Sequence, residues 1–265
     1  VLLCLGGMSV YDSFLHTFGS LGTGGFSNYN DSVGHFNTYI QIVILIFMIL
    51  AGMNFNLFFV LQRKGLRKFL HDDELRFYLA AIGIASTAIF ICNQVNSNFK
   101  DTARSLLDSF FQVVSILTTT GYVTDDYDLW PTFSRMILFC LFFFGGCSSS
   151  TSGGIKCVRV LVCLKLVRRS VSLRLHPNRI APITLNESEV PSEVIINITN
   201  FVFTYIAVIF AGMFLISVDN LDFMSTFSAV ATCVGNIGPG FNLVGPTCNF
   251  SVLSDFSTVI CSLLM

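Results

Sequence analysis

Long apolar stretches alternate with polar segments along this chain. Residues 36–60 carry no charge, and residues 76–92 and 193–218 carry none after their first residue. A helix that crosses a membrane needs about 20 mostly apolar residues. We therefore predict a membrane-spanning helix over each of these three stretches.

A fourth stretch, residues 130–168, is too long to be one spanning helix. At about 1.5 Å per residue it would extend nearly 60 Å, about twice the hydrocarbon thickness of a bilayer. The sequence "FFFGGCSSSTSGGIKC", residues 142–157, interrupts it with four glycines and five hydroxyl residues. Because each Gly costs about 1 kcal/mol relative to Ala inside a helix, we predict that the helix breaks here.

Composition agrees with a membrane protein. Of the 265 residues, 53% are hydrophobic and only 12% are charged, and the mean hydropathy is +0.71. A soluble domain carries about 25% charged residues. The net charge of −1 argues against binding to nucleic acid, which requires a basic surface. Nine cysteines occur without a C-x-x-C pair, so we interpret them as small membrane-buried residues.

The charged residues predict which side of the membrane each loop faces. Residues 62–76 and 156–179 together hold twelve of the fifteen Lys and Arg residues. By the positive-inside rule both segments are cytoplasmic. The alternate loops are then external, and they contain Asp31, Asp101, Asp125, Asp126, Asp128, Asp219 and Asp222.

One unit occurs three times along the chain. The copies are "DSFLHTFGSLGTGGF", "DSFFQVVSILTTTGY" and "STFSAVATCVGNIGP", with predicted N-cap residues Asp12, Asp108 and Ser225. In each copy a Phe follows the cap by two residues, and a Gly follows that Phe by eleven; these glycines are Gly25, Gly121 and Gly238. The nine or so residues between predict a helix too short to cross a bilayer, which enters from outside and turns back.

Such a unit suits the binding of a cation. The C-terminal carbonyls of a helix carry about half a negative charge. Non-helical backbone at membrane depth must line water or protein, and a ring of carbonyls can replace the hydration shell of an ion. A structural re-entrant turn or a Gly-rich cap between helices is the alternative. Three copies cannot close a four-fold ring, so we expect a fourth copy before Val1 and interpret the sequence as a fragment.

These motifs resemble the Trk/Ktr/HKT superfamily of potassium transporters, most closely its TrkH-type subunit. The residues that carry the resemblance are "GTGGFSNYN", "TTTGY", "GNIGPGF" and "GGCSSSTSGGIK". The resemblance implies an all-α integral membrane fold built from repeated helix–pore-loop–helix units of the potassium-channel type. These units are arranged with pseudo-four-fold symmetry, and three pore loops are present. Residues 1–70 would form the second repeat, residues 71–180 the third with a broken inner helix, and residues 181–265 the fourth with a truncated inner helix.

The resemblance also implies a set of site residues. The implied ion-filter residues are Gly22, Thr23, Gly24, Gly25, Thr118, Thr119, Thr120, Gly121, Gly235, Asn236, Ile237 and Gly238. Potassium would be coordinated by the backbone of Thr23, Gly24, Thr119, Thr120, Asn236 and Ile237. The implied gate residues are Gly145, Gly146, Ser150, Thr151, Gly153, Gly154 and Lys156.

Two alternatives remain open at the implied gate. Its small residues could instead serve G-x-x-x-G packing between helices. Lys156 could lie beside the ion cavity and pair with an acidic group, or it could extend to the cytoplasmic interface.

The function implied is potassium uptake across the cytoplasmic (inner) membrane by a multi-pass protein with no organic cofactor. A sodium-permeable or sodium/potassium-coupled transporter of the same superfamily is the alternative. The resemblance implies two partners, a cytosolic nucleotide-binding regulatory (TrkA-like) subunit and a second copy of the chain. For residues 168–193, contact with lipid headgroups competes with docking of the regulatory subunit.

Two other classes of protein fit the sequence less well. A serine hydrolase using the serines of residues 148–152 would need a nearby base, and no histidine lies inside a predicted span. A carrier with inverted repeats is disfavoured because the three units run in the same sense. His16 takes the place of Gln112 and Ala229 in the other copies, which indicates a packing role.

Overall fold

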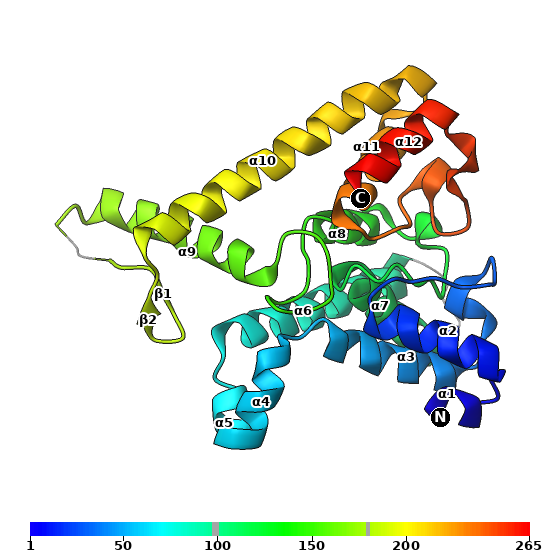
Figure 1. The fold of residues 1–265 in the computed structure, drawn as a ribbon, viewed down its shortest axis with the longest axis horizontal. Coiled ribbons are helices and arrows are strands. Elements are labelled where there is room, and N and C mark those ends of the chain that lie inside the picture. The colour runs from blue at the N-terminus through cyan, green and yellow to red at the C-terminus, as the bar shows by residue number, and fades with distance from the viewer. Residues whose placement is uncertain (97–100, 179–180) are drawn as a thin grey trace.

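The computed structural model describes residues 1–96, 101–178 and 181–265, and it is mainly helical (Figure 1). The helices are α1 (Leu2–Leu5), α2 (Val10–Leu21), α3 (Thr38–Ala51), α4 (Phe55–Lys64), α5 (Leu66–Phe69), α6 (Asp73–Asn96), α7 (Thr102–Leu117), α8 (Thr132–Leu141), α9 (Cys157–Leu175), α10 (Ser192–Ile216), α11 (Phe223–Gly235) and α12 (Asp255–Leu264). Strands β1 (Thr184–Leu185) and β2 (Ser188–Glu189) pair antiparallel.

Two of the predicted spans are single helices. Among the described residues, α6 and α10 are each long and apolar enough to cross a membrane, which confirms the predictions over 76–92 and 193–218. The prediction of one helix over 36–60 is wrong. There α3 and α4 meet at an angle of 84°, because α3 ends at Ala51, with Gly52 as its C-cap, and the side chain of Asn54 caps a new helix by accepting from the Asn56 N–H.

The predicted break in the long stretch 130–168 is confirmed. Helix α8 ends at Leu141 and α9 begins at Cys157. Residues 142–156 between them lie outside any helix, and we call them the gate loop. Its glycines and hydroxyl residues therefore stand where the backbone leaves helical geometry. The predicted unit boundary at residue 180, like Arg179, lies outside the described residues.

The three short helices of the repeated unit are α2, α7 and α11, but the predicted N-caps are wrong. The capping side chains belong to Ser9, Asp101 and Asp222, three to seven residues earlier. Ser9 and Asp222 accept from the N–H groups of Asp12 and Ser225, so those two residues occupy the third helical position. At 12, 16 and 13 residues, the helices are about 18 to 24 Å long, less than the thickness of the bilayer core.

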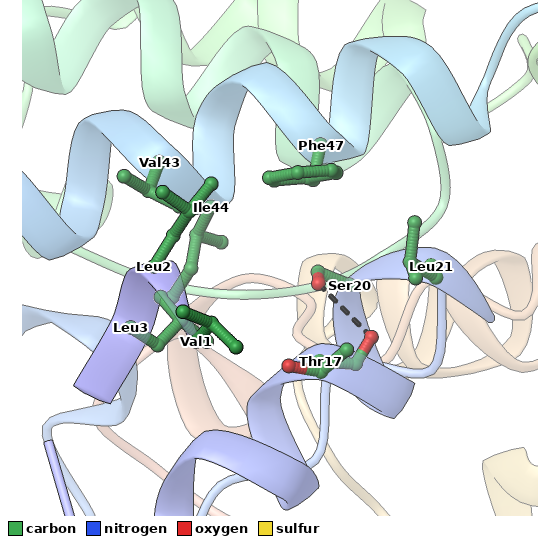
Figure 2. A pocket seen from close by; sticks show the side chains of 9 residues that line it. All are labelled: Val1, Leu2, Leu3, Thr17, Ser20, Leu21, Val43, Ile44 and Phe47. Atoms are coloured by element: carbon green, nitrogen blue, oxygen red, sulfur yellow. Dashed lines mark hydrogen bonds between the residues drawn. The ribbon is translucent and has the colours of Figure 1, made fainter. Parts of the chain in front are cut away.

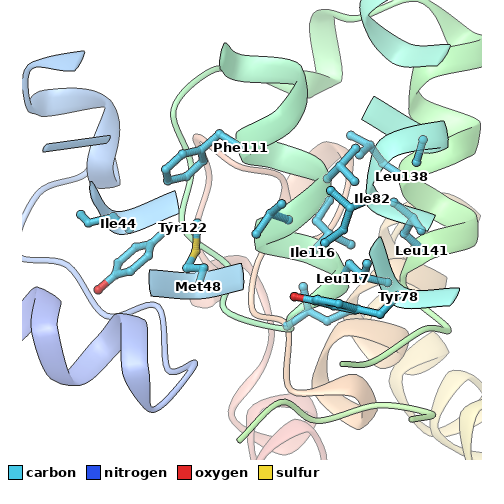
Figure 3. Packing of buried hydrophobic residues seen from close by; sticks show 14 of the residues in the cluster. Ile44, Met48, Tyr78, Ile82, Phe111, Ile116, Leu117, Tyr122, Leu138 and Leu141 are labelled. Atoms are coloured by element: carbon cyan, nitrogen blue, oxygen red, sulfur yellow. The ribbon is translucent and has the colours of Figure 1, made fainter. Parts of the chain in front are cut away.

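Helix α7 lies in the middle of the molecule. Residues 111–117 are buried on every side, and α7 packs against α3, α6 and α8 in one apolar cluster (Figure 3). The residues labelled there are Ile44, Met48, Tyr78, Ile82, Phe111, Ile116, Leu117, Tyr122, Leu138 and Leu141. A second cluster joins α10, α11 and α12, which lie on the far side of α6–α8 from α1–α3 (Figure 1). The unit built on α7 is thus flanked by the other two.

Candidate ion filter and gate loop

Three segments follow the short helices, and we call them F1 (residues 22–25), F2 (118–121) and F3 (235–238). All three have the same backbone alternation, with positive φ at the second and fourth residue. The angles are 50° at Thr23 and 64° at Gly25, 54° at Thr119 and 80° at Gly121, and 54° at Asn236 and 102° at Gly238. A left-handed conformation costs a non-Gly residue about 1–2 kcal/mol. Strain repeated three times at one position is typical of a functional site.

The backbone N–H groups of each segment turn back onto the preceding helix. In F1, the N–H groups of Gly24 and Gly25 donate to the Gly19 carbonyl. In F2, those of Thr120 and Gly121 donate to the Ser115 carbonyl, and in F3 that of Ile237 donates to the Thr232 carbonyl; the five distances are 2.8 to 3.3 Å. The carbonyl oxygens that were predicted to coordinate an ion accept no hydrogen bond from any of the described residues; they belong to Thr23, Gly24, Thr119, Thr120, Asn236 and Ile237. In each segment, backbone N–H groups therefore bond to the preceding helix, and these carbonyl oxygens stay available to a ligand.

The segments lie directly beside one another. A Cβ on Gly25 would overlap the carbonyl of Thr120 in F2, and a Cβ on Gly121 would overlap the carbonyl of Ile237 in F3. Gly238 would meet no heavy atom of the described residues within 4 Å. Glycine is therefore required sterically at the F1–F2 and F2–F3 contacts. The three predicted filter segments form one row with F2 in the middle.

Burial follows the same order. Thr118, Thr119 and Thr120 of F2 are buried, whereas Gly24 of F1 and Asn236 of F3 are exposed.

Two tyrosines just beyond F2 form hydrogen bonds with the chain that follows F1 and with the chain that follows F3. The hydroxyl of Tyr122 donates to the carbonyl of Phe26 at 3.2 Å, and that of Tyr127 donates to the carbonyl of Gly240 at 2.8 Å.

The gate loop is a closed hairpin of backbone. The Gly145 N–H donates to the Ile155 carbonyl at 2.7 Å, and the Cys157 N–H donates to the Gly146 carbonyl at 3.0 Å. Because Gly145, Gly146, Gly153 and Gly154 lie outside helices, the alternative of G-x-x-x-G packing between helices does not apply.

The gate loop contacts the end of each short helix or the segment that follows it. Thr151 donates its hydroxyl to the Leu21 carbonyl at 3.1 Å. The Gly153 N–H donates to Oγ1 of Thr119 at 2.6 Å, and a Cβ on Gly153 would lie 2.5 Å from the Gly235 carbonyl oxygen. The loop thus meets all three units where their helices end.

Lys156 is half-buried and turns into the gate loop. Its ammonium group donates to the carbonyl oxygens of Ser150, at 3.3 Å, and of Ser152. The predicted pairing with an acidic side chain is not found among the described residues, whose ion pairs involve other groups. The alternative extension of Lys156 toward the cytoplasmic interface stays a prediction.

Sequence reasoning missed Glu74, a buried acidic residue at the start of α6. Its carboxylate accepts hydrogen bonds from the backbone and hydroxyl of Ser148 and from the backbone of Val158. A signal was available, since Glu74, Tyr78 and Ile82 recur at a spacing of four along an apolar helix face. The neighbouring Asp73 lies on another face and pairs with Lys165 at 2.8 Å.

A second missed residue, Arg104, supports the chain on both sides of F2. Arg104, in α7, pairs with Asp108 at 2.9 Å and donates to Oε1 of Gln41 at 2.7 Å and to the Thr124 carbonyl at 3.3 Å. These contacts tie the helix before F2 to α3 and to the chain that leaves F2.

The acidic loop after F2 has structural partners. Asp125 accepts from the Trp130 indole at 2.6 Å, and Asp128 accepts from the Asn242 N–H at 2.9 Å. Burial raises the pKa of Asp128 to about 6. The loop therefore joins the chain leaving F2 to the chain leaving F3.

The predicted packing role of His16 is confirmed. Its buried ring stacks on Tyr122 and meets Phe36 edge to face, with centroids 5.6 and 5.1 Å away. Within the described ranges, no three His, Cys, Asp or Glu residues gather as metal ligands. The nine cysteines are free thiols; four are buried within the protein and three are exposed at its surface, and their burial in the membrane stays a prediction.

An apolar pocket of about 190 Å³ lies between α1, α2 and α3, and Leu21, the residue before F1, is part of its lining (Figure 2). Its hydroxyl groups are those of Thr17 and Ser20. Both donate within α2, to the carbonyls of Ser13 and Thr17. The walls of this pocket are therefore mostly apolar, and we assign no cation site to it.

Comparison with known proteins identifies close relatives. A family model described as "TrkH: Cation transport protein" matches residues 5–265. The Trk system potassium uptake protein TrkH of Salmonella typhimurium is 35% identical over 247 residues, which cover 91% of this chain and 50% of that protein. TrkG of Escherichia coli K12 is 32% identical over 98% of this chain and 54% of that protein.

The fold has a solved counterpart. The crystal structure of the potassium transporter TrkH from Vibrio parahaemolyticus matches with a TM-score of 0.92 at 28% identity, covering 98% of this chain and 56% of that one. The chain spans about half the length of the relatives that it matches.

Proposed function

The chain belongs to the TrkH family of cation transport proteins, and on that premise we propose that F1, F2 and F3 are three arcs of a potassium filter. The observation that carries the proposal is the set of six carbonyl oxygens without hydrogen bonds among the described residues, which three adjacent segments hold in the same strained backbone. Such oxygens can take the place of water around an alkali cation. The C-terminal ends of α2, α7 and α11 add negative potential beside them.

The filter is completed by a fourth arc outside this sequence, in a pseudo-four-fold arrangement of helix–pore-loop–helix units. Gly24 in F1 and Asn236 and Gly238 in F3 are exposed, whereas the three threonines of F2, which has a neighbour on both sides, are buried. A further segment between F3 and F1 would cover the exposed residues and leave the six carbonyls facing a common axis.

The gate loop controls the path. Its contacts with Leu21, Thr119 and Gly235 support a position across the inner end of the filter. In this position Gly145, Gly146, Ser150, Thr151, Gly153 and Gly154 obstruct the ion, and the charge of Lys156 repels cations. Opening then requires the hairpin to leave the helix ends.

The protein acts in potassium uptake as a multi-pass component of the cytoplasmic membrane. The names of its relatives and the apolar helices α6 and α10 support this role. Basic residues of α9, together with the neighbouring acidic β1–β2 hairpin, form a cytoplasmic surface for a TrkA-like regulatory subunit, and the working unit is a homodimer.

The test is ion flux through the full-length protein in liposomes, with potassium, rubidium and sodium compared in turn. We expect potassium and rubidium to pass in preference to sodium. Equal passage of sodium would support the sodium-permeable alternative. No flux of any of the three ions from correctly folded protein would refute the pathway.

A further inference from the structure

Glu74 holds the gate loop from outside it. Glu74 is only 6% exposed, and its carboxylate accepts hydrogen bonds from the gate loop and from Val158, the second residue of α9. Oε1 accepts from the Ser148 N–H at 2.6 Å and from the Val158 N–H at 3.1 Å, and Oε2 accepts from the Ser148 hydroxyl at 2.6 Å.

The three bonds join the outgoing arm of the hairpin to the start of α9. Ser148 lies on the outgoing arm, and Val158 is the second residue of α9, immediately after the returning arm. The N-terminus of a helix is electropositive, so the carboxylate also gains from its place at the start of α9. One carboxylate on α6 therefore fixes the loop and the helix that follows it.

Charge distinguishes this contact from the others that hold the loop. The Cys147 N–H donates to the Gly52 carbonyl at 2.8 Å, and the Phe55 N–H donates to the Ser149 carbonyl at 3.3 Å; both bonds are neutral. The bonds of Lys156 stay inside the loop. Hydrogen bonds to an ionised group are about twice as strong as neutral ones, and moving the loop away would leave the Glu74 charge buried without partners.

We propose that Glu74 is a positioning residue that latches the gate loop in the closed conformation. The proposal rests on the proposed function, because it assigns to Glu74 the stability of the obstructing state. When the latch is lost, the loop leaves the ends of α2, α7 and α11 more often, and flux rises while the filter itself is unchanged.

The experiment measures potassium flux per molecule and the potassium-to-sodium flux ratio in the full-length protein reconstituted in liposomes. The variants are Glu74→Ala, Glu74→Gln and Ser148→Ala. Asp73→Asn is the matched control, because Asp73 is adjacent in the chain and pairs with Lys165 rather than with the loop. We expect Glu74→Ala to raise flux by about tenfold or more, which corresponds to the loss of bonds to a charged group.

Smaller changes should follow from the other variants. Glu74→Gln keeps the shape without the charge and should give a smaller rise. Ser148→Ala removes one donor and should give about a fivefold rise. Asp73→Asn should leave flux unchanged, and all four variants should keep the wild-type ion ratio. A purely structural role would instead lower the amount of folded protein and its flux.

Two outcomes separate the latch from the pathway. Unchanged or lower flux per molecule in both Glu74→Ala and Ser148→Ala overturns the latch. If Glu74→Ala does not fold, Ser148→Ala alone decides. Gly121→Ser, measured in parallel, reports on the filter. If Gly121→Ser changes the potassium-to-sodium flux ratio while Glu74→Ala and Ser148→Ala leave flux unchanged, the latch is refuted and the filter proposal is retained.

Discussion

Gly121 stands where F2 meets F3, and its replacement by Ser tests that contact directly. Its φ of 80° lies in the left-handed region. A Cβ there would overlap the carbonyl oxygen of Ile237 and lie 2.9 Å from Cδ of Pro239. The variant Gly121→Ser therefore has to leave its conformation or push the Ile237 carbonyl away. Either change displaces an oxygen that we propose as an ion ligand.

The size of the effect follows from the backbone strain. A side chain in the left-handed region costs about 1–2 kcal/mol before any clash is counted. A difference of that size is roughly a factor of 5 to 30 in an equilibrium constant. If the filter relieves the strain by giving up its geometry, we expect the potassium-to-sodium flux ratio to fall by a factor in this range.

The assay compares tracer flux of potassium, rubidium and sodium in liposomes that contain the full-length protein. Gly83→Ser is the control. Gly83 lies in α6, where an added Cβ would meet no described heavy atom within 4 Å, and Ser is no worse than Gly in a helix. The reasoning is refuted if folded Gly121→Ser protein has the same flux ratios as Gly83→Ser.

Three further predictions concern the gate and the outer supports. Deleting residues 146–153 should raise unregulated flux because the obstruction is removed; a folded but silent channel in the same liposome assay would contradict this. Folding raises the pKa of Asp128 from 3.8 to about 6, so the folded protein binds this proton more tightly than the unfolded chain does. The contribution of Asp128 to stability is therefore greatest at low pH, and it is lost as the pH rises from about 4 to about 6. Thermal unfolding measured as a function of pH should show a smaller fall in stability over this range for Asp128→Asn than for the wild type. Identical profiles for the two proteins would refute the raised pKa of Asp128. Arg104→Met should lower the free energy of unfolding by about 2 kcal/mol, because the 5% exposed side chain of Asp108 loses its partner while Arg104 itself is partly solvated. Denaturation in detergent would measure the loss, and Arg104→Met with Asp108→Leu should recover part of it.

The sequence was informative wherever one local property decided the structure. A run of glycines and hydroxyl residues predicts the break between α8 and α9, because those residues are poor helix formers wherever they occur. The Phe-to-Gly spacing located F1, F2 and F3, since each segment depends on its own helix and its own Gly. In contrast, the 84° bend between α3 and α4 was missed. Hydropathy averaged over 36–60 does not register that Asn54 caps a new helix.

The role of Glu74 at the start of α6 was also missed from the sequence. Asp72, Asp73 and Glu74 are adjacent and acidic, and composition treats them alike. Only the packing of α6 against the gate loop buries Glu74 and leaves Asp73 to pair with Lys165. The role of Glu74 depends on which face of α6 packs against the gate loop, and the positions of charged residues in the sequence do not specify that packing.

The chain by itself therefore determined the membrane class, the broken helix and the three repeated units, because hydrophobic length, helix propensity and Gly spacing are local properties. Tertiary structure decided that F1, F2 and F3 lie side by side, that the gate loop reaches the ends of all three short helices, and that Lys156 turns inward. These are contacts between residues as far apart as Leu21 and Thr151. Their geometry depends on how the helices pack, which is a property of the whole fold.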